Sequence, residues 1–303
     1  MKLKPYTTAP ILAVLVFLMI LCAERILAGL DMNLDMYLLV CGAVQAAAYF
    51  LPLVLYGLLF GNISIGRMRF SLPTAISVPA QILLAVILLL GSALVSMLGI
   101  RLGFADAHDS ISLGIGSPSV LVLIAFAIVP AICEEIVFRG VIMSSFEMCG
   151  IAPAVIGTSL LFAFAHMSIE RFFVYFFSSV VLCFVAYVSR SIIASIVIHS
   201  VYNIAALTLG DYLNGVASHL ESFSLLFIVM LFLLWIFVIV ALTEISRVYR
   251  NYAEKGLESK YVPSKMTKAQ KLRASASVYF SFPFLLAVMI YISIVVFSMQ
   301  DVI

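Results

Sequence analysis

The sequence predicts an all-α membrane protein, a polytopic bundle of about nine transmembrane helices, with eight as the alternative count. Of its 303 residues, 64% are hydrophobic and 11% are charged, whereas a soluble globular domain carries about 25% charged residues. Apolar stretches long enough to cross a bilayer, roughly 17–25 residues each, also recur along the chain. Helices satisfy every backbone amide inside hydrocarbon, and these stretches are longer than the strands of a membrane barrel.

Nine apolar stretches predict the individual spans. The first continues to about residue 27 and lacks a small-residue cleavage site, so we expect a retained helix rather than a signal peptide. The fifth is short for a span. In chain order the stretches cover residues 9–27, 36–60, 75–98, 120–148, 153–167, 172–188, 192–207, 223–242 and 278–299.

Three segments organise the chain. Residues 1–117 are expected to hold the first transmembrane helices and an interfacial segment at 62–72, where polar and apolar residues alternate. Residues 118–207 are expected to form a transmembrane core with the candidate catalytic residues. Residues 208–303 are expected to hold the last transmembrane helices and a basic cytoplasmic loop at 246–277.

Loop charges predict how the chain sits in the membrane. When nine spans alternate, most basic residues of the loops fall on one side, so the positive-inside rule places the N-terminus in the cytoplasm and the C-terminus outside. The net charge of +2, without a basic stripe, gives no indication of a nucleic-acid partner. The basic side carries Lys2, Lys4, Arg67, Arg69, Arg190 and eight basic residues between 247 and 273; the other side carries Asp31, Asp35, Asp106, Asp109, Asp211 and Glu221, with Arg101 and Arg171.

Two adjacent carboxylates interrupt the fourth apolar stretch. A charge near the bilayer centre costs at least about 2.5–3.5 kcal/mol, so Glu134 and Glu135 need a partner or a function. Arg139 follows Glu135 by four positions on the same helix face, which predicts an ion pair. Glu134 points about 100° away around the helix and can face a polar interior. Pro130, one turn earlier, removes a backbone donor and is expected to kink or open the helix.

Two later stretches carry further polar residues. His166 follows Phe162 by one helical turn in the fifth stretch, and His199 lies on the same helix face as Asn203 in the seventh. Taken singly, each feature has a structural reading: the carboxylate–arginine pair as a buried ion pair, and each histidine as a hydrogen-bond partner between helices. Taken together, these costly side chains are best satisfied at one polar site in the bundle core.

These residues form three motifs that resemble those of the CAAX-protease and bacteriocin-processing family, intramembrane endopeptidases related to the type II CAAX prenyl endopeptidases. Residues 134–139, EEIVFR, resemble the EExxxR motif of that family; residues 162–166, FAFAH, resemble FxxxH; and residues 199–203, HSVYN, resemble HxxxN. The motifs occur in the family order on separate apolar stretches. The resemblance covers about residues 118–207.

The resemblance implies an intramembrane glutamic protease. By position, Glu134 is then the general base, His166 is its partner in activating a water, and His199 with Asn203 forms the oxyanion hole. No serine or cysteine in the sequence offers a comparably partnered nucleophile. The supporting residues are Glu135, Arg139 and Phe162.

The expected substrate is a membrane-associated peptide or a lipidated protein. A prenylated CAAX C-terminus, a double-glycine bacteriocin leader and a quorum-sensing propeptide all fit. The resemblance favours a bacterial plasma membrane, with membrane lipid as a partner, and leaves the oligomeric state open. Two other functions also remain open: a proton-coupled transporter, because buried Glu and His residues form proton relays, and a non-catalytic scaffold or immunity protein.

Metal dependence is a separate question. Glu134, His166 and His199 offer the two histidines and one carboxylate that some catalytic zinc sites use. The compact HExxH signature of zinc proteases is absent from the sequence. We expect a site without a metal cofactor and keep zinc as the alternative.

Overall fold

The computed structural model describes residues 4–61, 63, 68–103, 119–219, 225–256 and 267–300. Within these residues the chain is helical and contains no β-strand, which confirms the predicted all-α class. Segments η2 and η5 are 3₁₀ turns, whereas η3 and η4 are π-helical. In chain order the elements are α1 (Pro5–Ala28), α2 (Leu34–Phe60), η2 (Ala75–Ser77), α3 (Val78–Arg101), α4 (Val120–Leu123), η3 (Ile124–Ile128), α5 (Val129–Glu134), η4 (Glu135–Met143), α6 (Ser144–Phe146), η5 (Glu147–Cys149), α7 (Ile151–Ala165), α8 (Phe172–Ser189), α9 (Ile192–His219), α10 (Leu225–Glu254), α11 (Lys268–Tyr279) and α12 (Phe282–Gln300).

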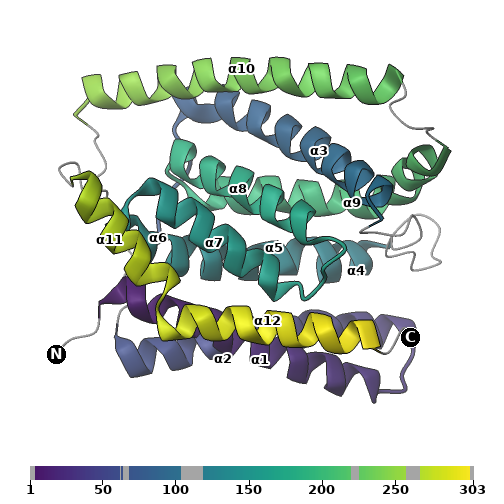
Figure 1. Cartoon of the computed structure of the whole chain (residues 1–303). Coiled ribbons are helices and arrows are strands. Elements are labelled where there is room, and N and C mark those ends of the chain that lie inside the picture. Colours follow the sequence, from purple (N-terminus) through teal and green to yellow (C-terminus); the bar gives the residue numbers. More distant parts are fainter. Residues whose placement is uncertain are drawn as a thin grey trace.

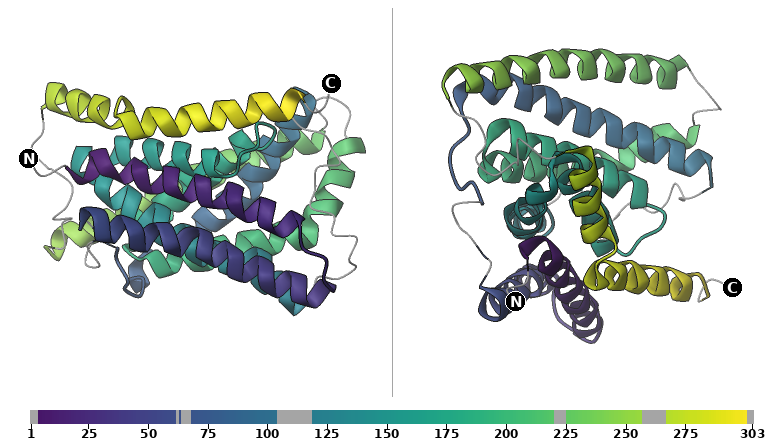
Figure 2. Two further views of the ribbon diagram at one scale, coloured as in Figure 1. Left: turned by 90° about the horizontal axis from the view of Figure 1, so that it is seen from below. Right: turned by 60° about the vertical axis from the view of Figure 1, so that its left-hand side comes forward.

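The helices stack in layers around the segment that carries the three motifs (Figure 1). In that view α10 and α3 lie above the motif-bearing helices α4 to α9, and α1, α2 and α12 lie below them. The right-hand view of Figure 2 shows the same order, with α10 at the top and α1 and α2 at the bottom. Contacts of α3 with α8 and of α2 with α5 join the outer layers to the centre. The motif helices are therefore enclosed on two sides.

Seven helices of the described residues are long and apolar enough to cross a membrane, or eight if the bent pair of α11 and α12 is one span. The expected nine is therefore too many, and the alternative of eight is the upper count. The fifth expected span is α7, whose 15 residues reach only about 22 Å, less than a hydrocarbon core of about 30 Å. The ninth is bent by 50° between Leu272–Tyr279 and Phe282–Phe297.

Helices also extend into stretches expected as loops. Helix α9 continues to His219, α10 continues to Glu254, and α11 begins at Lys268, so helices cover much of the expected basic loop at 246–277. Charged composition keeps a stretch out of hydrocarbon but does not oppose helix formation, and Thr267 begins α11 with a capping box. Other expectations rest on residues outside the described ranges: part of the interfacial segment at 62–72, and the loop carboxylates Asp106, Asp109 and Glu221.

The helix with the two glutamates is irregular. Over its 30 residues, Val120–Cys149, it alternates between α-helical and π-helical geometry and ends in a 3₁₀ turn. The Ser119 side chain caps its start by accepting a hydrogen bond from the backbone N–H of Val122 at 3.3 Å. Pro130 lacks a backbone donor and is the second residue of α5, which follows π-helical η3. The second π-helical segment, η4, begins at Glu135, and such segments often mark functional sites.

A sharp turn at Gly150 brings the second motif beside the first. Gly150 has a φ of +115°, which residues with a Cβ rarely adopt. Its backbone N–H donates to the carbonyl oxygen of Glu147 at 3.0 Å. Helix α7 starts at the next residue and returns along α6 and η4. The end of α7, where His166 follows, therefore lies in the same region as the glutamates.

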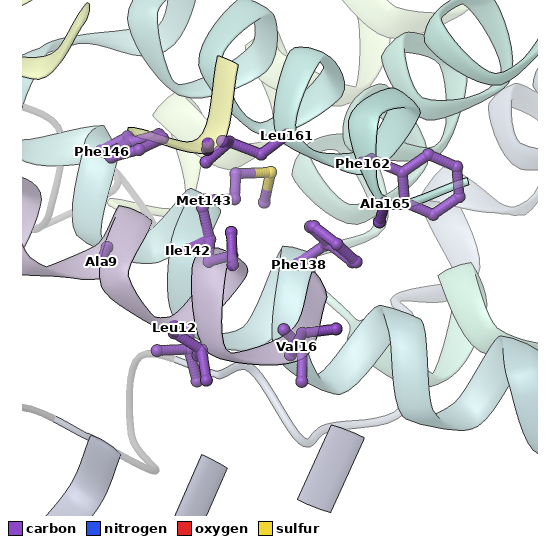
Figure 3. Packing of buried hydrophobic residues seen from close by; sticks show 14 of the residues in the cluster. Ala9, Leu12, Val16, Phe138, Ile142, Met143, Phe146, Leu161, Phe162 and Ala165 are labelled. Atoms are coloured by element: carbon purple, nitrogen blue, oxygen red, sulfur yellow. The ribbon is translucent and has the colours of Figure 1, made fainter. Parts of the chain in front are cut away.

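An apolar cluster holds the motif helices together (Figure 3). Leu12 and Val16 of α1 lie on one side of Phe138 and Ile142 of η4, and Phe162 of α7 lies on the other. All five side chains are buried. In a membrane such contacts stabilise mainly through van der Waals packing, because lipid tails are as apolar as the side chains. This packing fixes the position of η4 between α1 and α7.

Candidate functional site

The two adjacent glutamates lie at the junction of α5 and η4 and have different partners. The exposed fraction is 5% for Glu134 and 0% for Glu135. Buried carboxylates are costly unless they are paired or hydrogen-bonded. The partners of each oxygen therefore indicate what each glutamate does.

Glu135 is held by three side chains. Its Oε1 accepts from Nη1 of Arg139 at 2.7 Å, the ion pair that the four-residue spacing predicts. The same oxygen lies 2.9 Å from Nδ1 of His199. Its Oε2 accepts from the hydroxyl of Ser195 at 2.5 Å. With both oxygens engaged, this carboxylate connects η4 to α9 and leaves no oxygen free for a reacting molecule.

Arg139 extends the same connection to two further helices. Its Nη2 donates to the hydroxyl of Ser179 at 2.9 Å and to the backbone carbonyl of Ser179 at 3.2 Å, on α8. Its guanidinium also lies 4.6 Å from the centroid of the Phe162 ring, within range of a cation–π interaction. The ring centroid of Phe162 is 5.2 Å from that of Phe138, so the aromatic residue of the second motif packs directly on the first motif.

His199 lies between the two glutamates. Its Nδ1 is 2.9 Å from Oε1 of Glu135, and its Nε2 is 3.8 Å from Oε2 of Glu134. An ionised carboxylate only accepts hydrogen bonds, so Nδ1 carries a proton when Glu135 is ionised. The Nε2 atom is then the nitrogen that faces Glu134.

Glu134 has one oxygen engaged and one facing His199. Oε1 accepts a hydrogen bond from the hydroxyl of Tyr49, on α2, at 3.3 Å. Oε2 faces Nε2 of His199 at 3.8 Å, too long for a direct hydrogen bond. This oxygen is therefore less constrained than either oxygen of Glu135.

His166 directly follows α7 and is fixed by two contacts. Its Nδ1 is 2.9 Å from the backbone carbonyl of Phe162, so this nitrogen is the donor. Its ring is stacked on Tyr175 of α8, with centroids 3.7 Å apart and planes 23° from parallel. The second nitrogen, Nε2, is thus left as the atom that can act on a bound molecule.

Asn203, on α9, contacts the helix that carries the two glutamates. Its Nδ2 donates to the backbone carbonyl of Ala127 at 3.3 Å, in π-helical η3. The side-chain amide has two N–H donors, and this contact uses one of them. Asn203 therefore braces α9 against η3 one turn from His199 and keeps one donor.

The three motifs thus come together around Glu134 and Glu135. Among the described residues, no group of three His, Cys, Asp or Glu side chains is arranged to hold a metal ion. The alternative zinc set of Glu134, His166 and His199 is not arranged as such a group, and zinc dependence stays a prediction.

Four residues of this arrangement are not part of the motifs. Ser195 lies four positions before His199, so helical spacing could have placed it on the same face. Tyr49, Tyr175 and Ser179 sit in ordinary apolar stretches, and no local pattern of the sequence distinguishes them. Contacts between distant helices cannot be read from spacing within one helix.

Comparison with known proteins finds a match at the level of a family model. Residues 116–205 match the family model described as type II CAAX prenyl endopeptidase Rce1-like. The matched segment contains all three motifs and confirms the resemblance, although it covers well under half of the chain. No curated protein and no solved structure matches the chain.

Proposed function

We propose that this chain, a multi-pass membrane protein whose central segment carries the type II CAAX prenyl endopeptidase signature, is an intramembrane endopeptidase that hydrolyses its substrate with a water activated by Glu134. The observation that carries the proposal is the buried pair of Glu134 Oε2 and His199 Nε2, 3.8 Å apart. Two atoms at this separation can both contact one water molecule or one reacting oxygen, at about 2.8 Å from each.

The proposed reaction uses Glu134 twice. Its carboxylate takes a proton from the water, whose oxygen bonds to the carbon of the scissile carbonyl while the carbonyl electron pair moves onto oxygen. When this oxyanion collapses, the C–N bond breaks and Glu134 gives the proton to the leaving amine. His166 holds the water through Nε2, since its Nδ1 is occupied by the Phe162 carbonyl.

His199 and Asn203 are the proposed oxyanion donors. The doubly protonated His199 donates from Nδ1 to Glu135 and from Nε2 to the oxyanion. In that form the buried charges of Glu134, Glu135, Arg139 and His199 sum to zero, which lowers the cost of burying them. Asn203 supplies the N–H that Ala127 does not use. The proposal needs no metal cofactor, because Glu134 itself activates the water.

The proposed substrate is a membrane-associated or lipidated polypeptide. Prenylated CAAX ends are the class that the matched family name indicates. Bacteriocin leaders and quorum-sensing propeptides remain alternatives, since nothing in the cluster of polar side chains selects between them.

The experiment uses the purified full-length chain in liposomes with three fluorescence-quenched peptides. These are a farnesylated CAAX peptide, the same peptide without the farnesyl group, and a double-glycine leader peptide. We expect cleavage of at least one, and a fall in kcat of about 10²–10⁴-fold in Glu134→Gln. Glu244→Gln is the matched control, because Glu244 pairs with Arg247 on α10, away from the motifs. Absence of cleavage across the panel, or full activity in Glu134→Gln, would overturn the proposal.

The proposed location is a bacterial plasma membrane, with the N-terminus in the cytoplasm and the C-terminus outside. Helix α1 starts at one end of the bundle and α12 ends at the other, which supports opposite sides for the two ends (Figure 1). The test labels Asp31→Cys or Glu254→Cys with an impermeant maleimide, in a Cys22→Ser background because Cys22 is exposed. We expect labelling of Asp31→Cys in intact cells and of Glu254→Cys only after permeabilisation; the reverse pattern would contradict this orientation.

A further inference from the structure

Tyr49 contacts the candidate base from outside the matched segment. It lies on α2, 85 positions from Glu134 in the sequence, and donates its hydroxyl hydrogen to Oε1 of that residue at 3.3 Å. The exposed fraction is 3% for Tyr49 and 5% for Glu134, so the contact is closed to bulk solvent. A buried carboxylate depends strongly on each donor that it has.

The contact makes the two oxygens of Glu134 unequal. Oε1 faces the hydroxyl of Tyr49, and Oε2 faces Nε2 of His199. A general base is efficient when one oxygen is aimed at the proton that it must take. A donor on the opposite oxygen fixes the rotation of the carboxylate and leaves the other oxygen for the reaction.

Helix α2 is well placed to hold this donor. It packs against α5 and η3, the two elements that lead into the glutamate pair. Two helical turns after Tyr49, the hydroxyl of Tyr56 lies 2.9 Å from that of Thr8, which ties α2 to α1. The backbone under Tyr49 is thus fixed on both sides, so the hydroxyl has little freedom to leave Glu134.

We propose that Tyr49 is a positioning residue of the protease site: it holds Oε1 of Glu134 and so assigns Oε2, on the side of His199, as the oxygen that takes the proton from the attacking water. Tyr49 keeps its own proton throughout, while the water proton moves to Oε2 and then to the leaving amine. The inference rests on the proposed function, in which Glu134 is the base. The 3.3 Å separation is longer than the usual O–H···O distance of about 2.7–2.8 Å, and catalytic hydrogen bonds commonly shorten when substrate binds.

The kinetic test compares Tyr49→Phe with Tyr56→Phe. Each variant removes one buried hydroxyl from α2, but only the first removes a partner of Glu134. With whichever peptide of the panel the native protein cleaves, we expect kcat to fall about 10-fold in Tyr49→Phe with KM unchanged. The acidic limb of its kcat/KM profile is expected to move to higher pH, because a hydrogen-bond donor favours the ionised carboxylate. Tyr56→Phe is expected to keep both the native kcat and the native profile.

A second measurement needs no substrate. Infrared difference spectra against Glu134→Gln isolate the carboxylate band of Glu134. That band is expected to shift in Tyr49→Phe and to stay in place in Tyr56→Phe. If Glu134→Gln is inactive but Tyr49→Phe retains native kcat, pH profile and carboxylate band, the role of Tyr49 is wrong and the protease assignment stands. If Glu134→Gln is fully active, the assignment itself fails.

Discussion

Nδ1 of His199 lies 2.9 Å from Oε1 of Glu135, so the second glutamate of the adjacent pair, not the first, orients this histidine. The same oxygen accepts from Arg139 at 2.7 Å. One carboxylate therefore neutralises an arginine and directs an imidazole toward Glu134. Because the two neighbouring carboxylates have different partners, we expect substitutions of the individual residues of this cluster to have different effects.

Breaking the Glu135–Arg139 pair is expected to destabilise the fold. Glu135→Leu leaves Arg139 charged and buried, which typically costs about 3–5 kcal/mol. The double variant Glu135→Leu/Arg139→Leu leaves no unpaired charge in the pair and is expected to recover most of the lost thermal stability in detergent. It is expected to stay inactive, because His199 has lost the partner that orients it. If the double variant loses as much stability as Glu135→Leu and Arg139→Leu lose together, the two residues are not coupled in this way.

Asn203 is expected to act in catalysis more than in folding. Its amide makes one long contact, 3.3 Å to the Ala127 carbonyl, so its removal costs little stability. Loss of an oxyanion donor typically lowers kcat by about 10²–10³-fold, and we expect this of Asn203→Ala in the peptide assay. Thr208→Ala is the matched control on α9, since within the part of the chain that the structure describes its hydroxyl bonds to backbone carbonyls of its own helix. Equal kcat values in the two variants would show that Asn203 is not an oxyanion donor.

Much of this site could be predicted from spacing within single helices. The Glu135–Arg139 pair follows from a four-residue interval, and Ser195 lies on the His199 face by the same rule. The membrane class follows from composition alone, because a chain that is 64% hydrophobic has no soluble alternative of this size. Such features depend on local geometry, which the order of residues determines directly.

Contacts between helices could not be predicted in this way. Nothing in the sequence connects Tyr49 with Glu134 or Ser179 with Arg139, since each pair depends on how two separate helices pack. The span count was too high for a related reason. Its apolar composition identified α7 as a candidate span, but the helix is shorter than the hydrocarbon core of a bilayer. Its position in the bundle depends on packing against α8 and η4, which composition does not indicate.

Activity is expected to survive metal chelation. Among the described residues no group of three His, Cys, Asp or Glu side chains is arranged to hold a metal ion, and in the proposed mechanism Glu134 is the base that activates the water. Cleavage of the panel peptide is therefore expected at native rate after incubation with 1,10-phenanthroline, with a known zinc protease inhibited in parallel. Complete loss of cleavage that Zn²⁺ restores would replace the glutamic mechanism with a zinc-dependent one.

The ring of Tyr175, rather than its hydroxyl, is expected to matter for His166. The two rings are stacked with centroids 3.7 Å apart, and the Phe162 carbonyl fixes Nδ1, so together they set the direction of Nε2. Tyr175→Phe preserves the stacked ring and is expected to keep kcat within about 3-fold of native, whereas Tyr175→Leu frees the imidazole and is expected to lower kcat by about 10-fold or more. KM should change little in either variant, because the ring acts through His166. A Tyr175→Phe variant as impaired as Tyr175→Leu would show that the hydroxyl, not the stacking, is required.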